Sequence, residues 1–374
     1  MSLWGFRAGI IRRLVAAGHD VYALCAEDDY TEQVRSLGAT VVALDMSRFI
    51  TPLKDLRLIW VLYRLFRKEQ FDVVHTFTHK PNIYGVIAAR LAGCPRIVAS
   101  VTGLGVLFTF KSGVRWWLAR RVFMMLSWVS FRASHKAAFW NADICNRMLS
   151  AGLIPKAKTV LIRGSGIDLS QFSPHVVDED RVRSLRCELS GSERTRFVLM
   201  VSRLVWGKGV AEFVEAAELL YEACPDAVFV LVGPLEEEGH QGVSREYIEA
   251  RQGPRLRWLG FREDVRELMA LADVVVLPSH GEGIPRSMLE AMAMARPIVT
   301  TDTFGCRDVV EHGRNGLMVP LRSPRAVADA IALLLGNDAL RRRMGQRGRQ
   351  KVEEEFAEEL VVARVFQELY GLSA

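Results

Sequence analysis

The sequence predicts an α/β protein built from two doubly wound parallel sheets, and three observations support this class. Short apolar runs rich in β-branched residues alternate with longer amphipathic segments, as buried parallel strands alternate with crossover helices. The length of 374 residues is enough for two domains of ordinary size. A content of 50% apolar and 25% charged residues is typical of a folded globular chain and excludes a disordered one.

The first half begins with a helix in residues 4–18. Its apolar residues Phe6, Ile10 and Leu14 share one face, and Gly18 ends it. The expected strands that follow are 21–25, 40–44, 71–76, 96–101, 137–140 and 159–162. The expected helices between them are 52–67, 82–92 and 142–151.

The second half repeats the alternation. We expect strands in residues 197–201, 227–232, 256–259, 273–278 and 298–299, and helices from Pro324 onward. The predicted division is an N-terminal domain 1–172, a linker 173–195, a second domain 196–352, and a C-terminal helix 353–374 that crosses back to the first domain.

The central stretch is residues 272–301, ADVVVLPSHGEGIPRSMLEAMAMARPIVT. The strand 273–278 ends in the polar, glycine-rich turn SHGEG. Pro285 fits the first turn of the following helix, where its missing N–H has no consequence. Arg296-Pro297 ends that helix, and the next strand begins at Ile298.

Polar residues of this stretch are placed for a ligand. Glu282 lies in the loop, and Glu290 lies about a turn and a half into the helix. Unpaired N–H groups at the helix start suit a phosphate, and carboxylates beside it can accept hydrogen bonds from sugar hydroxyls. Gly281 and Gly283 let the backbone approach a ligand closely. The alternative interpretation is a solvated acidic helix start.

The segment GEGIPRSMLEAMA, with Glu282 and Glu290 eight residues apart, resembles the E-x7-E element of retaining GT-B glycosyltransferases of family 4, also called glycosyl transferases group 1. The resemblance implies two Rossmann-like domains that face each other across a cleft. It assigns Glu290 to the ribose of a nucleotide-sugar donor and Glu282 to hydroxyls of the donor sugar. Gly281, Gly283, Ile284, Pro285 and Phe261 would line the nucleotide.

Two cations follow the strand 197–201 in the segment SRLVWGKG. Arg203 and Lys208 would neutralise a donor diphosphate without a metal ion, and the family carries these residues as diphosphate ligands. A surface lysine is the plain alternative. Because the leaving group is a diphosphate, catalysis would be largely charge stabilisation by Arg203, Lys208 and the helix at Pro285, with Glu282 beside them.

No metal or disulfide framework is expected. Asp178-Glu179-Asp180 spells DxD, a metal–nucleotide motif of a different transferase fold, but it lies in the polar linker and we expect it to be solvated charge. The six cysteines are scattered without a CxxC, which indicates reduced thiols. In the second domain, Cys306-Arg307 directly follows Gly305, at the place where the family carries Pro-Glu after this glycine.

The segment HTFTHKPNIYG, which starts at His75, resembles the family branch that extends polyprenyl-diphosphate-linked sugars. We expect His79, Lys80, Asn82, Thr102 and Gly103 on the acceptor side, because ligands bind beyond the carboxyl ends of parallel strands. Many relatives carry a histidine where Thr102 stands. The alternative is a strand end with a solvated pair of histidines.

Family members begin with an apolar strand and a glycine-rich loop before the first helix, and here the sequence starts at the helix. The first strand of a doubly wound sheet is central, so without it the sheet has an open position. We hypothesise that the natural start lies upstream by about one strand and one turn.

Residues 111–136 are basic and apolar, with no Asp or Glu. One interpretation is a core-facing helix with a basic outer face. The other is a helix at the membrane interface, with aromatic rings at headgroup depth and arginines on anionic lipid. Nucleic acid is a weaker candidate, because no reading motif accompanies the charge. No run of about 18 apolar residues predicts a membrane-spanning helix.

The sequence therefore predicts a metal-independent glycosyltransferase that retains anomeric configuration. It would move a sugar, with UDP-HexNAc as the first candidate donor, to a polyprenyl-diphosphate-linked saccharide in O-antigen, lipopolysaccharide or capsule assembly. The net charge of +6 favours acidic partners such as anionic lipid. We therefore expect a peripheral protein on the cytoplasmic face of an anionic membrane. The rival functions are a UDP-sugar 2-epimerase and a non-catalytic, membrane-associated nucleotide-sugar binder.

Overall fold

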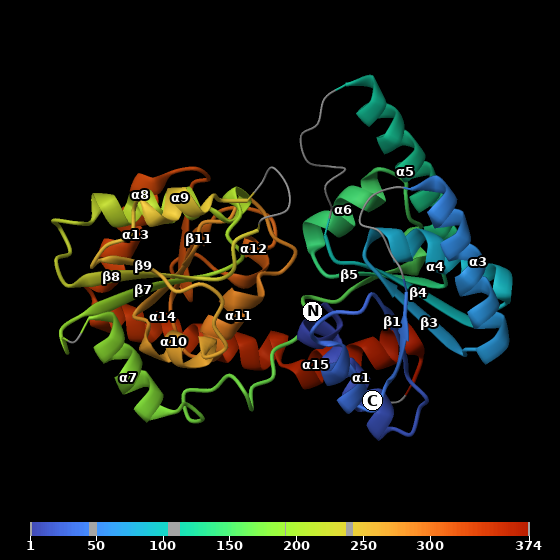
Figure 1. Cartoon of the computed structure of the whole chain (residues 1–374), viewed down its shortest axis with the longest axis horizontal. Helices are drawn as coiled ribbons and strands as arrows, with labels where there is room; N and C mark the ends of the chain where they lie inside the picture. The colour runs from blue at the N-terminus through green and yellow to red at the C-terminus, as the bar shows by residue number, and fades with distance from the viewer. Residues whose placement is uncertain (1, 45–50, 104–112, 191, 237–241, 373–374) are drawn as a thin grey trace. The chain divides into compact units, whose positions relative to one another are not determined.

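The computed structural model describes residues 2–44, 51–103, 113–190, 192–236 and 242–372. The chain divides into two compact units. The first unit is Met1–Gly166 with Glu358–Ala374, and the second unit is Ile167–Ala357. Each unit is α/β and contains parallel strands covered by helices (Figure 1). The predicted α/β class with doubly wound sheets is therefore confirmed.

The sheet of the first unit is in two parts. β3 (Val73–Phe77), β4 (Arg96–Val101), β5 (Lys136–Phe139) and β6 (Thr159–Leu161) form a parallel sheet in that order. β1 (Tyr22–Cys25) and β2 (Thr40–Ala43) form a separate parallel pair, and within the described residues no ladder joins β1 to β3.

Helices cover both faces of the four-stranded sheet. The helices before the linker are α1 (Ser2–Ala16), α2 (Thr31–Ser36), α3 (Pro52–Glu69), α4 (His79–Ala92), α5 (Val114–Ala133), α6 (Ala142–Ser150) and the short turn η2 (Lys156–Lys158). Ile97 and Ala99 of β4 pack with residues of α3, α4 and α6, whereas Val98 faces α1 and the C-terminal helices. This alternation is the two-residue period of a strand buried on both faces.

The C-terminal segment belongs to the first unit. α15 (Glu358–Arg364) and η5 (Val365–Tyr370) follow a break at Ala357, and Val365 and Leu369 are completely buried against the sheet. The side chain of His75 in β3 joins this segment to the sheet. Its Nδ1 is 2.7 Å from the Tyr370 hydroxyl, and its Nε2 is 2.7 Å from the Ser100 hydroxyl. His75 is therefore an internal residue and not half of a solvated pair.

The second unit has one six-stranded parallel sheet of order β12-β11-β10-β7-β8-β9. The strands are β7 (Arg196–Val201), β8 (Ala227–Val232), β9 (Leu256–Trp258), β10 (Val274–Leu277), β11 (Ile298–Thr301) and β12 (Gly316–Val319). The helices are α7 (Glu179–Leu189), η3 (Trp206–Lys208), α8 (Val210–Leu219), α9 (Arg245–Glu249), α10 (Val265–Leu271), α11 (Arg286–Ala293), α12 (Cys306–Val309), α13 (Pro324–Leu335), α14 (Asp338–Lys351) and η4 (Val352–Phe356). The chain places β7, β8 and β9 side by side in one direction and then returns to place β10, β11 and β12 on the other side of β7. This reversal is typical of a doubly wound sheet.

Helix α7 lies where the sequence predicts linker. The Asp178 carboxylate caps this helix by accepting a hydrogen bond from the backbone N–H of Arg181. The inner face of the helix carries the buried side chains of Leu185 and Leu189. Glu179 and Asp180 are exposed in its first turn, where acidic side chains favour the helix dipole. The DxD sequence is therefore a helix start.

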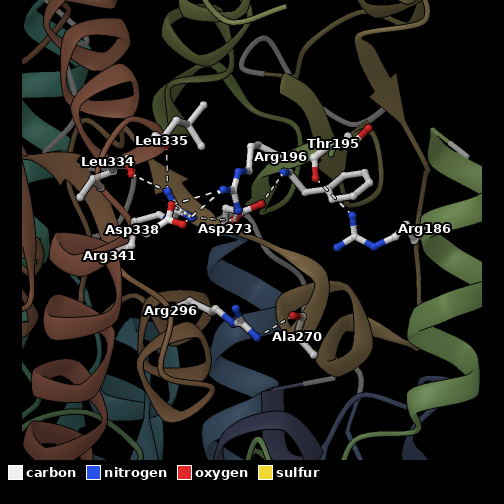
Figure 2. A network of polar contacts seen from close by, with 11 residues as sticks. Arg186, Thr195, Arg196, Ala270, Asp273, Arg296, Leu334, Leu335, Asp338 and Arg341 are labelled. Carbon is white, nitrogen blue, oxygen red and sulfur yellow. Dashed lines mark hydrogen bonds and ion pairs between the residues drawn. The ribbon is translucent and has the colours of Figure 1, made fainter. Parts of the chain in front are cut away.

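A polar network holds the amino ends of the central strands of the second unit (Figure 2). The Asp273 carboxylate, directly before β10, accepts hydrogen bonds from the backbone N–H of Phe197 at 2.9 Å and from the Arg196 guanidinium at 3.1 Å. Arg341 of α14 lies 3.3 Å from Asp273 and donates to the last carbonyls of α13. This network fixes the strand edge opposite to the one that carries the candidate site.

Candidate functional site

The predicted strand–loop–helix–strand unit is present in the second unit as β10, the loop 278–285, α11 and β11. The helix begins at Arg286 and Pro285 takes the capping position, one residue before the place the sequence suggests. The loop is packed tightly against its neighbours. A Cβ on Gly281 would lie 2.2 Å from the ring of Phe304, so a side chain at this position would force that ring to move.

Lys208 and Glu282 meet at the carboxyl ends of β7 and β10. The Lys208 ammonium donates to both oxygens of the Glu282 carboxylate at 2.7 Å. Only 8% of the Glu282 side chain is exposed, compared with 25% for Lys208. Two of the three ammonium protons can serve the carboxylate while the third points elsewhere. A cation and a carboxylate are thus held together at the edge where ligands bind in open α/β sheets.

Glu290 lies inside α11 beside Arg286. The Arg286 Nε is 2.9 Å from the Glu290 carboxylate, one helical turn away. Burial raises the pKa of the Glu290 carboxyl, and the nearby Arg286 guanidinium opposes that rise. Arg286 is not among the site residues predicted from the sequence, although its four-residue spacing from Glu290 is a recognisable signal for such a pair.

Arg203 follows β7 and its side chain is half exposed. Its guanidinium forms an ion pair with the Glu236 carboxylate. Both cations of the predicted donor site, Arg203 and Lys208, therefore have carboxylate partners from the chain itself. Glu236 is a residue that the sequence analysis missed, because it lies beyond β8 and nothing in its local pattern points to Arg203.

The rest of the donor-side residues frame this edge. Phe261 follows β9 with 59% of its surface exposed, a high value for a phenylalanine. Gly305 has φ of +77°, and a Cβ there would lie 2.4 Å from the carbonyl oxygen of Glu282, so a glycine is needed for this approach. Cys306, which departs from the family pattern, is completely buried, and burial raises the pKa of its thiol to about 12. It is an inert core residue.

The predicted acceptor-side residues belong to the first unit. α4 begins at His79, so His79 and Lys80 lie in its first turn, and the ring of His79 contacts Phe123 edge-on at 5.3 Å. Lys80 is 2.8 Å from the Asp55 carboxylate of α3. Asn82 is buried, accepts from the Thr76 hydroxyl and donates to the carbonyl of Ser100. Lys80 and Asn82 are thus committed to internal contacts.

Thr102 and Gly103 follow β4 and are half-buried. They lie at the carboxyl edge of the sheet, as the sequence predicts. The residues that follow, 104–112, lie outside the described part of the chain, and they include Lys111 of the predicted basic segment. A small cavity beside this edge is lined by His79, Asn82, Ile83, Val101, Phe123, Ser127, Ser130, Phe131 and Met148.

Helix α5 has a buried face and an exposed apolar face. Phe123, Ser127, Ser130 and Phe131 point into the first unit. The opposite face exposes Trp117, Leu118, Val122, Met125, Trp128 and Val129. We call these six residues the α5 apolar face. Arg121 lies over the ring of Trp117 at 5.2 Å, and Arg132 lies over that of Trp128 at 3.9 Å.

Comparison with known proteins decides the family. Residues 185–351 match the family described as glycosyl transferases group 1, and residues 6–135 match the glycosyl transferase 4-like domain. A Campylobacter jejuni enzyme, N,N'-diacetylbacillosaminyl-diphospho-undecaprenol alpha-1,3-N-acetylgalactosaminyltransferase, is 31% identical over 99% of this chain and 95% of its own. The chain is a group 1 glycosyltransferase. The predicted family is confirmed.

Two further relatives are similar to this glycosyltransferase over most of its chain. The Escherichia coli UDP-Gal:alpha-D-GlcNAc-diphosphoundecaprenol alpha-1,3-galactosyltransferase is 31% identical over 86% of this chain and 81% of its own. The Staphylococcus aureus capsular polysaccharide biosynthesis glycosyltransferase CapM is 26% identical over 94% of this chain and 90% of its own.

Solved structures agree on the fold. A glycosyltransferase from Rickettsia africae superposes with a TM-score of 0.82 at 16% identity, covering 99% of this chain and 95% of its own. Anabaena HepE, solved with UDP and glucose, superposes with a TM-score of 0.79 at 19% identity, covering 98% of this chain and 95% of its own. The glycosyltransferase therefore has the GT-B fold, as the sequence predicts.

Proposed function

We propose that this glycosyltransferase moves a HexNAc from a UDP-HexNAc donor to a polyprenyl-diphosphate-linked saccharide in surface polysaccharide assembly, with retention of configuration. Relatives named for GalNAc or Gal transfer to undecaprenyl-diphosphate-linked sugars, similar over most of the chain, support the substrate classes. The observation that carries the donor part is the Lys208–Glu282 pair at the carboxyl edge of the second sheet.

On the donor side, the diphosphate would lie between the Arg203 and Lys208 cations and the N-terminus of α11. Fixed cations and helix N–H groups stabilise the charge that develops on the leaving phosphate without needing a metal ion. Glu282 would accept from donor-sugar hydroxyls while Lys208 orients it, and Glu290 would accept from the ribose. The nucleotide would be lined by Gly281, Gly283, Ile284, Pro285 and Phe261.

The reaction needs no protein nucleophile in this proposal. The acceptor hydroxyl attacks the anomeric carbon from the face that the diphosphate leaves, and the departing phosphate oxygen takes the hydroxyl proton. The products are the extended saccharide and UDP. Arg203 and Lys208 hold the negative charge on UDP as the glycosidic bond to it breaks.

On the acceptor side, we propose that His79, Thr102 and Gly103 line the saccharide site of the first unit. Lys80 and Asn82 would support it indirectly, because their polar groups already hold α4 to α3 and to the sheet.

We propose that the α5 apolar face lies on the inner leaflet of an anionic cytoplasmic membrane, where the lipid-linked acceptor is found. Tryptophan with a stacked arginine suits headgroup depth, since the ring is amphipathic and the guanidinium can meet lipid phosphate. A third such pair, Arg64 over Trp60 at 4.8 Å, is exposed on α3. None of the described helices combines the length and apolarity that crossing a bilayer requires.

The test is an assay of the purified chain with UDP-GalNAc, UDP-GlcNAc, UDP-Gal and UDP-Glc, with and without a polyprenyl-diphosphate-linked monosaccharide. Mass spectrometry should show a lipid product heavier by one HexNAc residue with UDP-GalNAc or UDP-GlcNAc, in the presence of a metal chelator. Free epimerised UDP-sugar without lipid product would instead favour an epimerase. Binding without turnover on any acceptor would favour the non-catalytic binder.

A further inference from the structure

The turn that carries Lys208 is in direct backbone contact with the loop that carries Glu282. The carbonyl oxygen of Gly207 accepts hydrogen bonds from the backbone N–H of His280 at 2.9 Å and from the Ser279 hydroxyl at 3.1 Å. A Cβ on Gly209, where φ is +80°, would lie 2.1 Å from the carbonyl oxygen of Pro278. The two segments can approach this closely because position 209 has no side chain.

A second contact joins the same two segments through side chains. The Nε2 of His280 is 2.7 Å from a carboxylate oxygen of Glu212. Glu212 lies in the first turn of α8, directly after the turn that carries Lys208, and only 6% of it is exposed. Within the described part of the chain, His280 is the one group that hydrogen-bonds to this carboxylate. A buried carboxylate is costly without a partner, so the pair is strongly favoured to stay closed.

We propose that Glu212 and His280 are positioning residues that hold Lys208 and Glu282 in place for the donor diphosphate. This inference rests on the proposed function of the second unit. The 212–280 pair and the 208–282 pair connect the same two segments at two separate points. These two side-chain pairs add to the backbone contacts of Gly207, and contacts on both sequence sides of Lys208 restrict the orientation of its turn as well as its distance from the loop.

The benefit of such positioning lies in the placement of the Lys208 ammonium. A cation that is already in place when the diphosphate binds needs no reorganisation, and fixed charges of this kind stabilise a leaving group most effectively. Without the Glu212–His280 link, the turn that carries Lys208 would be less restrained, and the position of its ammonium would depend on Glu282 and on the backbone contacts of Gly207. The contribution of Lys208 to diphosphate binding should therefore depend on His280 and Glu212.

The experiment is a double-mutant cycle measured by calorimetric titration of the full chain with UDP. Lys208→Ala should weaken UDP binding by about 10- to 100-fold in the wild-type background, as expected for a charge-assisted hydrogen bond. In a Glu212→Ala/His280→Ala background the same change should weaken binding by less than about threefold. The double background removes both partners, so no unpaired buried charge is left to unfold the protein.

Two controls separate positioning from stability. Glu212→Gln can still accept a hydrogen bond from His280 and should retain the full Lys208 effect. Arg196→Ala disturbs the network at the opposite strand edge (Figure 2) and should lower the melting temperature while leaving the Lys208 effect intact. An equal Lys208 effect in both backgrounds would overturn the inference alone. Wild-type protein that binds neither UDP, GDP nor ADP would overturn the proposed donor site and the inference with it.

Discussion

At the scale of residues, the Arg203 guanidinium is ion-paired with the Glu236 carboxylate. A diphosphate must share or displace this partner, so Glu236 competes with the donor for the guanidinium. We expect Glu236→Gln to tighten UDP binding by about two- to fivefold, the range for a partly exposed ion pair. Calorimetric titration of both proteins checks this.

The control for that titration is Glu249→Gln, which removes an exposed carboxylate paired with Arg245. It should leave the Kd for UDP unchanged. Weaker UDP binding by Glu236→Gln would contradict the competition and would mean that Glu236 orients Arg203 for the ligand.

The buried carboxyl of Glu290 should make the unfolding free energy of the protein depend on pH. Burial raises the pKa of its carboxyl above the value in the unfolded chain, with Arg286 opposing the rise. Folding therefore favours the protonated form, so the contribution of Glu290 to the unfolding free energy is fully present below pH about 4.5 and is lost as the pH rises through the folded pKa. Glu290→Gln has no charge to bury and escapes this loss.

We therefore expect the difference in melting temperature, Glu290→Gln minus wild type, to become larger as the pH is raised from about 4 to about 7. Scanning calorimetry at several pH values measures it, with the exposed Glu354→Gln as a control. A difference that is constant or decreases over this range would show that Arg286 outweighs burial.

At the scale of elements, α5 has the buried face of a core helix and also an exposed apolar face. Phe123 and Phe131 pack inward, as a core helix requires, while Trp117 and Trp128 remain exposed beside arginines. Each arginine near an anionic surface contributes about 1 kcal/mol to binding. Arg121→Ser/Arg132→Ser should thus weaken binding to anionic vesicles by about 30-fold, and high salt should have a similar effect.

Vesicle sedimentation measures that binding. Replacing Trp117 and Trp128 by serine should also weaken it, including on vesicles without anionic lipid. The matched control is Tyr221→Ser, which removes an exposed ring that also lies under an arginine, Arg255, but in the second unit. Equal vesicle binding by wild type and the α5 variants would contradict membrane contact through this helix.

At the scale of the whole molecule, the fold followed from apolar periodicity. The buried strands β7, β8 and β10 are continuous apolar runs, and such runs predict parallel strands without help from tertiary contacts. Several shorter elements were missed, β12 and α7 among them. β12 has only four residues and begins with a glycine, and α7 is polar apart from Val182, Leu185, Cys187 and Leu189.

The site followed from the sequence only in part. The alternation of strands and helices indicates that Lys208 and Glu282 share one edge of the sheet, because carboxyl ends of parallel strands meet there. The partners of the site are less accessible to sequence reasoning. Glu236 is 33 residues from Arg203, and Glu212 is 68 residues from His280, so these pairs depend on how the segments pack in three dimensions.

The most direct test of the account is the anomeric configuration of the product. The purified enzyme would be incubated with the active UDP-sugar and the polyprenyl-diphosphate-linked acceptor, and the proton coupling constant of the new linkage measured by NMR. We predict an α linkage from the α-configured donor, and loss of nearly all product with Lys208→Ala. A β linkage, or full activity of Lys208→Ala, would contradict the account.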